Sequence, residues 1–301
     1  MKKNQKKKKI TIIVDGTNYL YRSYFSFKNL KNKKKKPIGV IYGTLVMLKK
    51  IFNKYFPKKI IIVFDHYKPN FRKKIYPKYK STRKKTPTEI IKQSKKLIKI
   101  IKYMGIPTIK IPGFEADDII GTLVRNIKKK GEKILILTND KDLMQLINKN
   151  VKILSHKKKI IDKKKVIKKF GISPKLIQYF LAIVGDRSDN IPGIPGIGIK
   201  TAQIILNKFS SLKKIYKNLN KLYLLNVRNS YKLKNIFIKY KKIAFISNLL
   251  TKINTKVKIS ILKKKLNLKK PNKKKIFEYF KKNDFKKLKK SFKKSLWFNK
   301  L

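Results

Sequence analysis

The stretch Gly113-Phe114-Glu115-Ala116-Asp117-Asp118-Ile119-Ile120-Gly121 carries three carboxylates within four residues. Acidic residues are scarce elsewhere, because the chain has 83 Lys and Arg against 14 Asp and Glu, with a formal net charge of +69. Nine of the carboxylates nevertheless fall into five short groups, which are Asp15; Asp65; Glu115, Asp117 and Asp118; Asp140 and Asp142; and Asp186 and Asp189. Clustering of acids in so basic a chain indicates a site that needs them together.

Strands and helices alternate on either side of this stretch. Buried, β-branched strands are predicted at 10–14, 59–64, 133–137 and 151–154. Helical spacing of apolar residues predicts helices at 42–56, 89–104 and 116–129. The alternation predicts an α/β fold with a mostly parallel central sheet flanked by helices on both faces.

Acids follow three of the four predicted strands, at Asp15, Asp65 and Asp140. Ligand sites in parallel sheets lie beyond the carboxyl ends of the strands, so we expect these acids to converge. The alternative for any single one of them is a helix N-cap. Five acidic groups in one chain favour the shared site.

The segment between Asp65 and Glu89 is basic and aromatic, and three prolines interrupt it. This composition predicts a projecting segment rather than core. Aromatic rings beside cations suit single-stranded nucleic acid, because bases stack on rings while Lys and Arg meet phosphates. An ordinary solvated loop is the alternative. The residues concerned are Tyr67, Phe71, Arg72, Tyr76, Tyr79, Lys80 and Arg83.

The chain after about Lys163 has a helical pattern to its end, and within it lies G-I-P-G-I-G at Gly193–Gly198. This motif predicts a hairpin between two helices, where glycines let backbone N–H groups approach a phosphate at the next helix N-terminus. Such contacts would hold a duplex backbone without reading its bases. A plain Gly/Pro turn is the alternative.

The donor set for a metal would be oxygen only, since the chain has no Cys and only two His. Oxygen ligands select hard ions, Mg²⁺ foremost with Mn²⁺ as a substitute. The many carboxylates predict two or more ions, which beside a DNA backbone would support phosphodiester hydrolysis. Lys80 and Arg83 are the candidates to steady the charge that develops on the phosphate.

Composition excludes disulfides, and no apolar run approaches the roughly 20 residues of a membrane span. The basic run Lys2–Lys9 resembles the start of a signal peptide, but the apolar run after it is too short. We expect a soluble cytoplasmic protein that associates with the nucleoid.

The net positive charge favours nucleic acid as the binding partner, with an anionic membrane surface as the second candidate. Part of the lysine excess is typical of a protein encoded by an A/T-rich genome, because arginine occurs only six times.

Several stretches together carry a family resemblance. They are I-I-V-D-G-T-N-Y-L-Y-R at 12–22, V-F-D at 63–65, F-R-K-K-I-Y-P-K-Y-K-S-T-R at 71–83, G-F-E-A-D-D-I-I-G-T-L at 113–123, D-K-D-L-M-Q-L at 140–146 and G-D-R-S-D-N-I-P-G-I-P-G-I-G-I-K-T-A at 185–202. Over about residues 10 to 288 the chain resembles the bacterial 5′–3′ exonuclease domain of DNA polymerase I, a member of the flap endonuclease family.

The resemblance implies a PIN/FEN-like nuclease core, a helical arch through which a 5′ single strand passes, and a helix-hairpin-helix region on the duplex. The expected divisions are a catalytic domain at 1–170 with the arch at 66–90, a helix-hairpin-helix region at 171–265, and a lysine-rich helical tail at 266–301. The implied activity is that of a 5′–3′ exonuclease and flap endonuclease, which removes RNA primers and flaps in Okazaki fragment processing and repair.

The resemblance also implies roles for individual residues. All nine clustered acids would be metal-site carboxylates, and the catalytic residues would be Lys80, Arg83, Asp15 and Asp117. Tyr79 would stack on a base, and hairpin carbonyls near Gly193–Gly198 would hold K⁺. The expected DNA-binding residues are Arg22, Phe71, Arg72, Tyr79, Gly193, Gly196, Gly198, Lys200 and Thr201. The expected partners are branched or RNA-primed DNA and a separate polymerase and ligase, with a monomeric protein and no membrane.

Two features depart from the family pattern. Asn139 stands where the family usually has Gly before the paired acids, and Asn tolerates left-handed backbone better than most residues. The chain ends near the point where DNA polymerase I would continue, so we expect a free-standing nuclease without polymerase activity. Two alternatives stay open, a catalytically degenerate module that binds branched DNA and an RNA-processing nuclease with a similar acid cluster.

Overall fold

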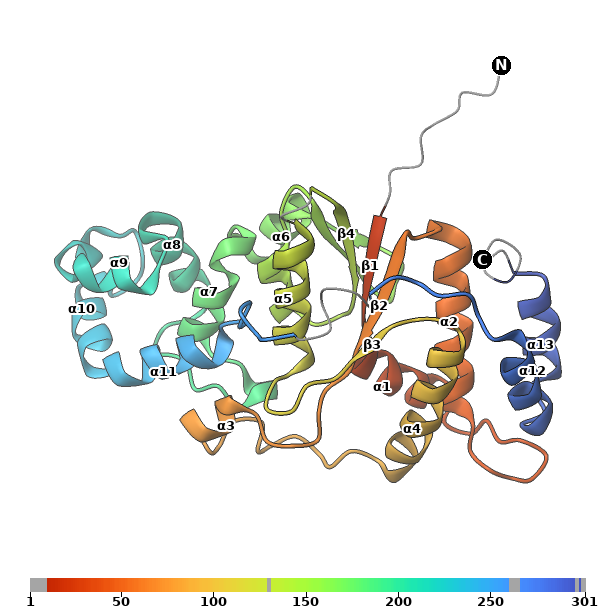
Figure 1. The fold of residues 1–301 in the computed structure, drawn as a ribbon. Coiled ribbons are helices and arrows are strands. Elements are labelled where there is room, and N and C mark those ends of the chain that lie inside the picture. The colour runs from red at the N-terminus through yellow and green to blue at the C-terminus, as the bar shows by residue number, and fades with distance from the viewer. Residues whose placement is uncertain (1–9, 129–130, 260–265, 296–297, 299–301) are drawn as a thin grey trace, which may run out of the picture.

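The centre of the molecule is a six-stranded sheet in the order β3-β2-β1-β4-β5-β6 (Figure 1). The computed structural model describes residues 10–128, 131–259, 266–295 and 298, so the Lys2–Lys9 run and parts of the predicted tail lie outside it. The strands are β1 (Ile10–Asp15), β2 (Lys59–Val63), β3 (Thr108–Ile109), β4 (Lys133–Leu137), β5 (Val151–Leu154) and β6 (Ile160–Ile161). All pairs are parallel except β5 with β6, which confirms the predicted fold class.

Both faces of the sheet are covered, which is why most residues of β1, β2 and β4 are apolar and buried. Successive strand residues point to opposite faces. Ile12 and Val14 belong to one buried cluster, whereas Ile13 belongs to another. The first cluster includes residues of α1 (Gly16–Ser26), α2 (Gly39–Tyr55) and α4 (Thr88–Tyr103), and the second includes α5 (Ala116–Lys128), on the other side of the sheet in Figure 1.

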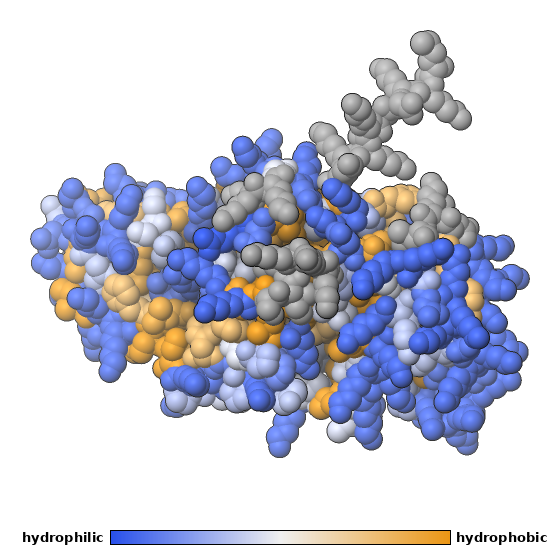
Figure 2. Space-filling model, viewed as in Figure 1, coloured by the Kyte–Doolittle hydropathy of each residue, from blue (hydrophilic) through white to orange (hydrophobic). Residues whose placement is uncertain are grey.

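A helical pair near the C-terminus covers the outside of α2 and α4. These helices are α12 (Lys273–Lys282) and α13 (Lys286–Lys293). Phe280, Leu288 and Phe292 are buried in the same cluster as α2 and α4. Their lysines face outward, and hydrophilic side chains dominate this part of the surface in Figure 2.

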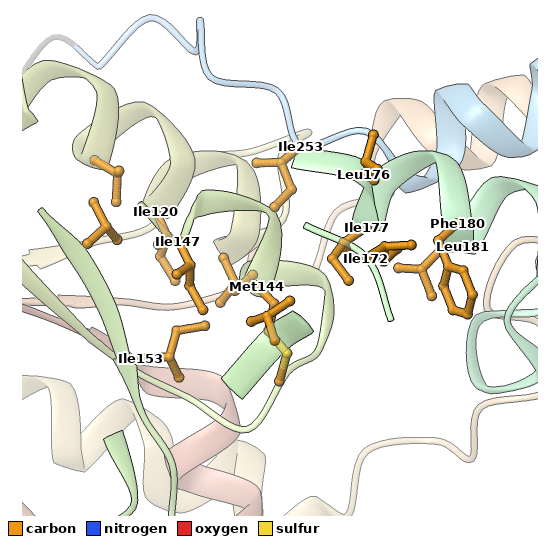
Figure 3. Packing of buried hydrophobic residues seen from close by; sticks show 14 of the residues in the cluster. Ile120, Met144, Ile147, Ile153, Ile172, Leu176, Ile177, Phe180, Leu181 and Ile253 are labelled. Atoms are coloured by element: carbon orange, nitrogen blue, oxygen red, sulfur yellow. The ribbon is translucent and has the colours of Figure 1, made fainter. Parts of the chain in front are cut away.

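Further helices follow β6 along the chain. They are α6 (Lys163–Phe170), α7 (Ile177–Val184), α8 (Ile199–Phe209), α9 (Leu212–Lys217), α10 (Ser230–Lys239) and α11 (Lys241–Thr251). In Figure 1, α6 lies beside α5, whereas α7 to α11 form the other end of the molecule. Their core is continuous with that of the sheet, as Figure 3 shows for Ile120 and Ile153 on one side and Ile177 and Phe180 on the other. The sheet and the helices that follow it therefore share one buried cluster.

The prediction of helix from Lys163 to the end is wrong for residues 252–259, which form no helix or strand. This segment lies close to α5, where a Cβ on Gly121 would come within 2.5 Å of the side chain of Ile253. Among the described residues, no helix is long and apolar enough to cross a membrane.

Candidate metal centre

The carboxyl ends of three neighbouring strands bring acids to one edge of the sheet. Asp15 is the last residue of β1, Asp65 follows β2, and Asp140 follows β4. Asp15 is buried; its Oδ1 accepts from the backbone N–H of Asn18 at 3.0 Å and caps α1, while its Oδ2 accepts from Thr138 Oγ1 at 2.8 Å. The N-cap alternative is thus true of Asp15, which nevertheless lies near enough to Asp65 and Asp140 for their charges to raise its pKa.

Two overlapping groups of carboxylates form the centre of the site. One ligand oxygen from each of Asp117, Asp140 and Asp142 lies within 4.8 Å of the others, and the same holds for Asp142, Asp186 and Asp189. Asp142 belongs to both groups, so together they form one continuous acidic basin. We call these five residues the acid basin.

Different elements supply the acid basin. Asp117 lies in the first turn of α5, and Asp142 begins the 3₁₀ helix η1 (Asp142–Leu146). Asp186 caps the 3₁₀ helix η3 (Arg187–Asp189), whose last residue is Asp189. The turn at Asp140 leads from β4 into η1, and both Asp140 and Asp142 reach the site.

The acids repel one another strongly. Burial, together with the charges of Asp140, Asp189 and Asp186, raises the pKa of Asp142 to about 8. Burial and the charges of Asp65 and Asp140 raise the pKa of Asp15 to about 7. Asp117 also has a pKa well above its ordinary value, because it is buried beside Asp140 and Asp15.

The raised pKa values of these neighbouring carboxyl groups fit a site that binds a cation. Carboxylates this close need protons or positive charge to compensate them. Asp142 Oδ1 is moreover buried without a hydrogen-bond partner among the described residues. Buried oxygens without partners are suited to coordinate hard divalent ions.

Two cations from the segment after α3 (Phe71–Ile75) lie against the acids. Lys80 Nζ donates to Glu115 Oε1 at 2.6 Å and is 3.5 Å from Asp189 Oδ2, and the Arg83 guanidinium also pairs with Asp189. Burial alone would raise the pKa of Glu115, but the charges of Lys80 and Arg72 outweigh it and hold that pKa below its ordinary value. These two predicted arch cations therefore border the acids, as their proposed role requires.

The prediction that this segment projects rather than packing in the core is wrong at Tyr79, which is buried. Tyr79 is 2% exposed, and its hydroxyl donates to Glu115 Oε2 at 3.1 Å and Asp189 Oδ2 at 3.3 Å. The ring packs beside Ile191 and Leu250, so in this arrangement it is not available to stack on a base. In Figure 1 the segment runs from α3 to α4 past the lower end of α5.

Glu115 and Asp118 meet different partners although they are only three residues apart. Glu115 lies just before α5 and turns toward Lys80, whereas Asp118 is fully buried against Arg72. Asp65 is exposed, and its Oδ1 accepts from the Ala116 backbone N–H at 2.7 Å, which ties it to the start of α5.

Three polar residues at the site were not predicted. Thr138 holds Asp15, Asn70 Nδ2 donates to Glu115 Oε1 at 2.7 Å, and Lys141 Nζ is 3.0 Å from Asp186 Oδ2. Thr138 follows a predicted strand and Lys141 lies between Asp140 and Asp142, which was the available signal, whereas no predicted acid adjoins Asn70 in the sequence. Asn139 in turn accepts from the His156 backbone N–H at 2.9 Å, so it fastens the turn after β4 to the turn after β5.

The G-I-P-G-I-G motif forms the turn between α7 and α8, with η3 before it. Gly193 has φ of 68° and Gly196 has φ of 84°, a backbone that favours glycine. Gly198 precedes α8, no side chain caps that helix, and Lys200 beside it is exposed. The first N–H groups of α8 are thereby free of side-chain caps and suited to a phosphate.

The remaining predicted DNA-binding side chains lie on three different helices. Arg22 is half-buried on α1, and Phe71 is half-buried with its ring 6.2 Å from that of Phe114. Thr201 is half-buried in the first turn of α8.

Comparison with known proteins gives two adjoining family matches. The model for the 5′-3′ exonuclease N-terminal resolvase-like domain matches residues 10–171, and that for the 5′-3′ exonuclease C-terminal SAM fold matches residues 172–274. The chain is 48% identical over 269 residues to a 5′-3′ exonuclease of Buchnera aphidicola subsp. Schizaphis graminum, covering 88% of this chain and 93% of that protein. It is 35% identical over 221 residues to the thermostable DNA polymerase I of Thermus thermophilus, covering 73% of this chain and 26% of that protein.

Solved structures show the same fold at low identity. A bacteriophage T5 flap endonuclease complex with DNA and metal ions superposes with a TM-score of 0.69 at 23% identity, covering 82% of this chain and 90% of that one. The catalytic core of Rad2 in complex with DNA substrate gives 0.61 at 18% identity, covering 92% and 88%.

Proposed function

The chain belongs to the 5′-3′ exonuclease family, and we propose on this basis that it is a divalent-metal-dependent nuclease acting on DNA 5′ ends and 5′ flaps. Its work would be the removal of RNA primers and flaps during replication and repair. The observation that carries the proposal is the acid basin, where Asp142 joins two carboxylate groups that Lys80 and Arg83 border.

The basin, with Asp15, would hold Mg²⁺ ions, and Mn²⁺ could replace them. When bound, such ions activate a water and stabilise the leaving oxygen of a phosphodiester. That T5 flap endonuclease was solved with metal ions supports the same requirement here.

The protein's own residues would bind and orient the substrate. Lys80 and Arg83 provide positive charge beside the acids, where the scissile phosphate must bind. The α7–α8 hairpin would hold the duplex backbone through the N-terminus of α8 and the exposed Lys200, and its carbonyls could hold K⁺. We further propose that the protein works as a monomer at the nucleoid, together with a separate polymerase and ligase.

A catalytically degenerate DNA-binding module is not favoured. Catalysis needs the acids to converge, and the acid basin brings five of them together with raised pKa values at Asp117, Asp140 and Asp142. A module that only bound DNA would not need carboxylates that repel one another and the DNA backbone.

The test uses a labelled duplex with a 5′ flap, incubated with Mg²⁺ and wild type, Asp117→Asn or Lys80→Ala. We expect cleavage by wild type and strong loss in both variants. Absence of cleavage by wild type, or undiminished cleavage by both variants, would refute the proposal. Tight Mg²⁺-independent flap binding without cleavage would point to the degenerate module, and a preference for RNA hairpins to an RNA-processing nuclease.

A further inference from the structure

Arg72 on α3 is buried, at 2% exposure, and each of its guanidinium nitrogens has a partner. Nη1 donates to Asp118 Oδ2 at 2.7 Å and lies 3.4 Å from Glu115 Oε2, and Nη2 donates to Asp118 Oδ1 at 2.8 Å. Nε donates to the Leu250 carbonyl, and Nη2 also donates to the Lys252 carbonyl, both at 2.8 Å. Four of the five guanidinium N–H groups thus donate within the protein, and the buried guanidinium lies beside two carboxylates rather than toward a DNA phosphate.

The Asp118 carboxylate likewise accepts hydrogen bonds within the protein on both of its oxygens. It is fully buried, and besides the two Arg72 bonds its Oδ1 accepts from the Asn254 backbone N–H at 2.8 Å. Its Oδ2 also accepts from the Glu115 backbone N–H at 3.3 Å. A carboxylate with four such bonds has no lone pair left for a metal.

The pair joins three parts of the chain that are far apart in sequence. These are α3 at the base of the arch segment, α5 with its acids, and the segment that follows α11. Thr122 adds to the junction on the α5 side, since its Oγ1 accepts from the Val257 backbone N–H at 3.2 Å. Ile253, on the same segment, is part of the core shown in Figure 3.

A series of backbone hydrogen bonds connects this junction to Lys80. The Tyr76 backbone N–H donates to the Arg72 carbonyl at 2.8 Å, the Tyr79 N–H to the Tyr76 carbonyl at 2.9 Å, and the Lys80 N–H to the Asp189 carbonyl at 2.8 Å. Leu250, whose carbonyl holds Arg72, also packs against the Tyr79 ring. A shift of Arg72 would therefore move the backbone that carries Lys80.

We propose that Arg72 and Asp118 form an internal clamp that positions Lys80 against Glu115, and that neither residue binds metal or DNA. This assigns both residues a role different from the metal ligand and the DNA contact that the family resemblance implies. The inference rests on the proposed nuclease function only for its kinetic test.

The first test separates the clamp from the metal site. Calorimetric titration with Mn²⁺ should show that Asp117→Asn weakens binding at least about tenfold. The double variant Arg72→Met/Asp118→Leu, which replaces the pair by apolar side chains, should bind Mn²⁺ like wild type. Mn²⁺ binding by the double variant as weak as that by Asp117→Asn would overturn the proposal.

The second test measures the coupling. Asp118→Asn should lower the Tm by roughly 10 °C in EDTA, because it leaves a buried guanidinium without its partner. The double variant should have a higher Tm than either Arg72→Met or Asp118→Leu alone. Additive losses in the double variant would show that the two side chains do not act as a pair.

The third test asks whether Arg72 or Asp118 contacts a DNA phosphate. The slope of log affinity against log salt for a flap duplex, measured in EDTA, should be the same for Lys80→Ala and for Lys80→Ala combined with Arg72→Met/Asp118→Leu, because this background removes any contact that Lys80 itself makes with DNA. Loss of one phosphate contact would reduce that slope by about 0.9 and would overturn the proposal.

The last test asks whether Arg72 positions Lys80. Arg72→Lys keeps the charge but loses the planar fork of donors. It should lower kcat in the wild-type background and leave kcat unchanged in a Lys80→Ala background, because Arg72 acts through Lys80. Equal loss in both backgrounds would contradict the proposal. Failure of wild type to cleave at all would count against the proposed function, while the metal, Tm and DNA-binding tests would still decide the clamp.

Discussion

At the scale of single residues, Asp142 has a central place in the site. It contributes to both carboxylate groups, and its Oδ1 is buried without a hydrogen-bond partner among the described residues. Removing its charge would leave Asp117 and Asp140 in one incomplete group and Asp186 and Asp189 in another. No other residue of the acid basin belongs to both groups.

Asp142→Asn should therefore lose the stabilisation that divalent ions give to the folded protein. Wild type should gain about 2.7 kcal/mol in unfolding free energy when Mg²⁺ is present at 100 times its dissociation constant, since the ion binds only the folded state. Thermal unfolding with and without Mg²⁺ checks this. Glu278→Gln on the exposed face of α12 is the control and should respond to Mg²⁺ like wild type. An undiminished response of Asp142→Asn would contradict its role.

The raised pKa values predict how stability depends on pH. Asp142 has a folded pKa of about 8 and Asp15 of about 7, both above the ordinary value of 3.8. The folded state therefore holds more protons than the unfolded state between about pH 4 and pH 8, so the free energy of unfolding falls as pH rises through this range. In EDTA, Tm should drop from pH 5 to pH 8.5, and Asp142→Asn should show a smaller drop. A Tm that rises over this range in EDTA would contradict the account.

At the scale of elements, the longer strands could be predicted from the sequence. The two-residue strands, and contacts between residues far apart in the chain, could not. β4 and β5 have the predicted bounds, because their β-branched runs are buried on both faces. β3 and β6 have two residues each, too short for a periodic signal. The burial of Tyr79 could not be predicted either, since it depends on Glu115 and Asp189, which lie far along the chain.

The adjacent acids Asp117 and Asp118 illustrate the same limit for the site. The sequence indicated that this stretch carries metal-site acids, and the structure brings Asp117 into the acid basin. Only the position of Arg72, 46 residues away, draws Asp118 out of it. Spacing predicts which acids are neighbours, whereas the partner that each one meets depends on the whole fold.

The hairpin between α7 and α8 should be sensitive to any side chain at Gly193. This residue has φ of 68°, and an added Cβ would lie 2.5 Å from the backbone nitrogen of Gly185. Gly193→Ala should cost about 1–3 kcal/mol in unfolding free energy and weaken duplex binding. The matched control is Gly131→Ala, because Gly131 has φ of 71° with nothing within 4 Å of such a Cβ. Denaturant unfolding that shows equal losses for both would mean that the close contact at Gly193 does not matter.

At the scale of the whole molecule, charge is distributed unequally along the chain. The chain has no Asp or Glu between Asp189 and Glu278, a range that includes the hairpin and α8 to α11. The acids of the site lie at the junction of this basic region with the sheet. Nucleic acid drawn to the basic helices would therefore meet the acid basin at their boundary.

The lysines should differ in their contribution to DNA binding. Lys200 beside the hairpin should contact a phosphate, so Lys200→Met should reduce the slope of log affinity against log salt by about 0.9. Lys274 on the outer face of α12 is the matched control, and Lys274→Met should leave the slope unchanged. Binding of a flap duplex in EDTA over a salt series would measure both. Equal effects would indicate that the lysines act only through net charge.

The central claim is that the acid basin cuts DNA at a 5′ flap. The most direct measurement uses two labelled duplexes of the same sequence, one with a 5′ flap and one with a 3′ flap, incubated with wild-type protein and Mg²⁺. The account predicts release of the 5′ flap in Mg²⁺, none in EDTA, and no release of the 3′ flap. Equal cleavage of both flaps, or cleavage of the 5′ flap that persists in EDTA, would contradict it.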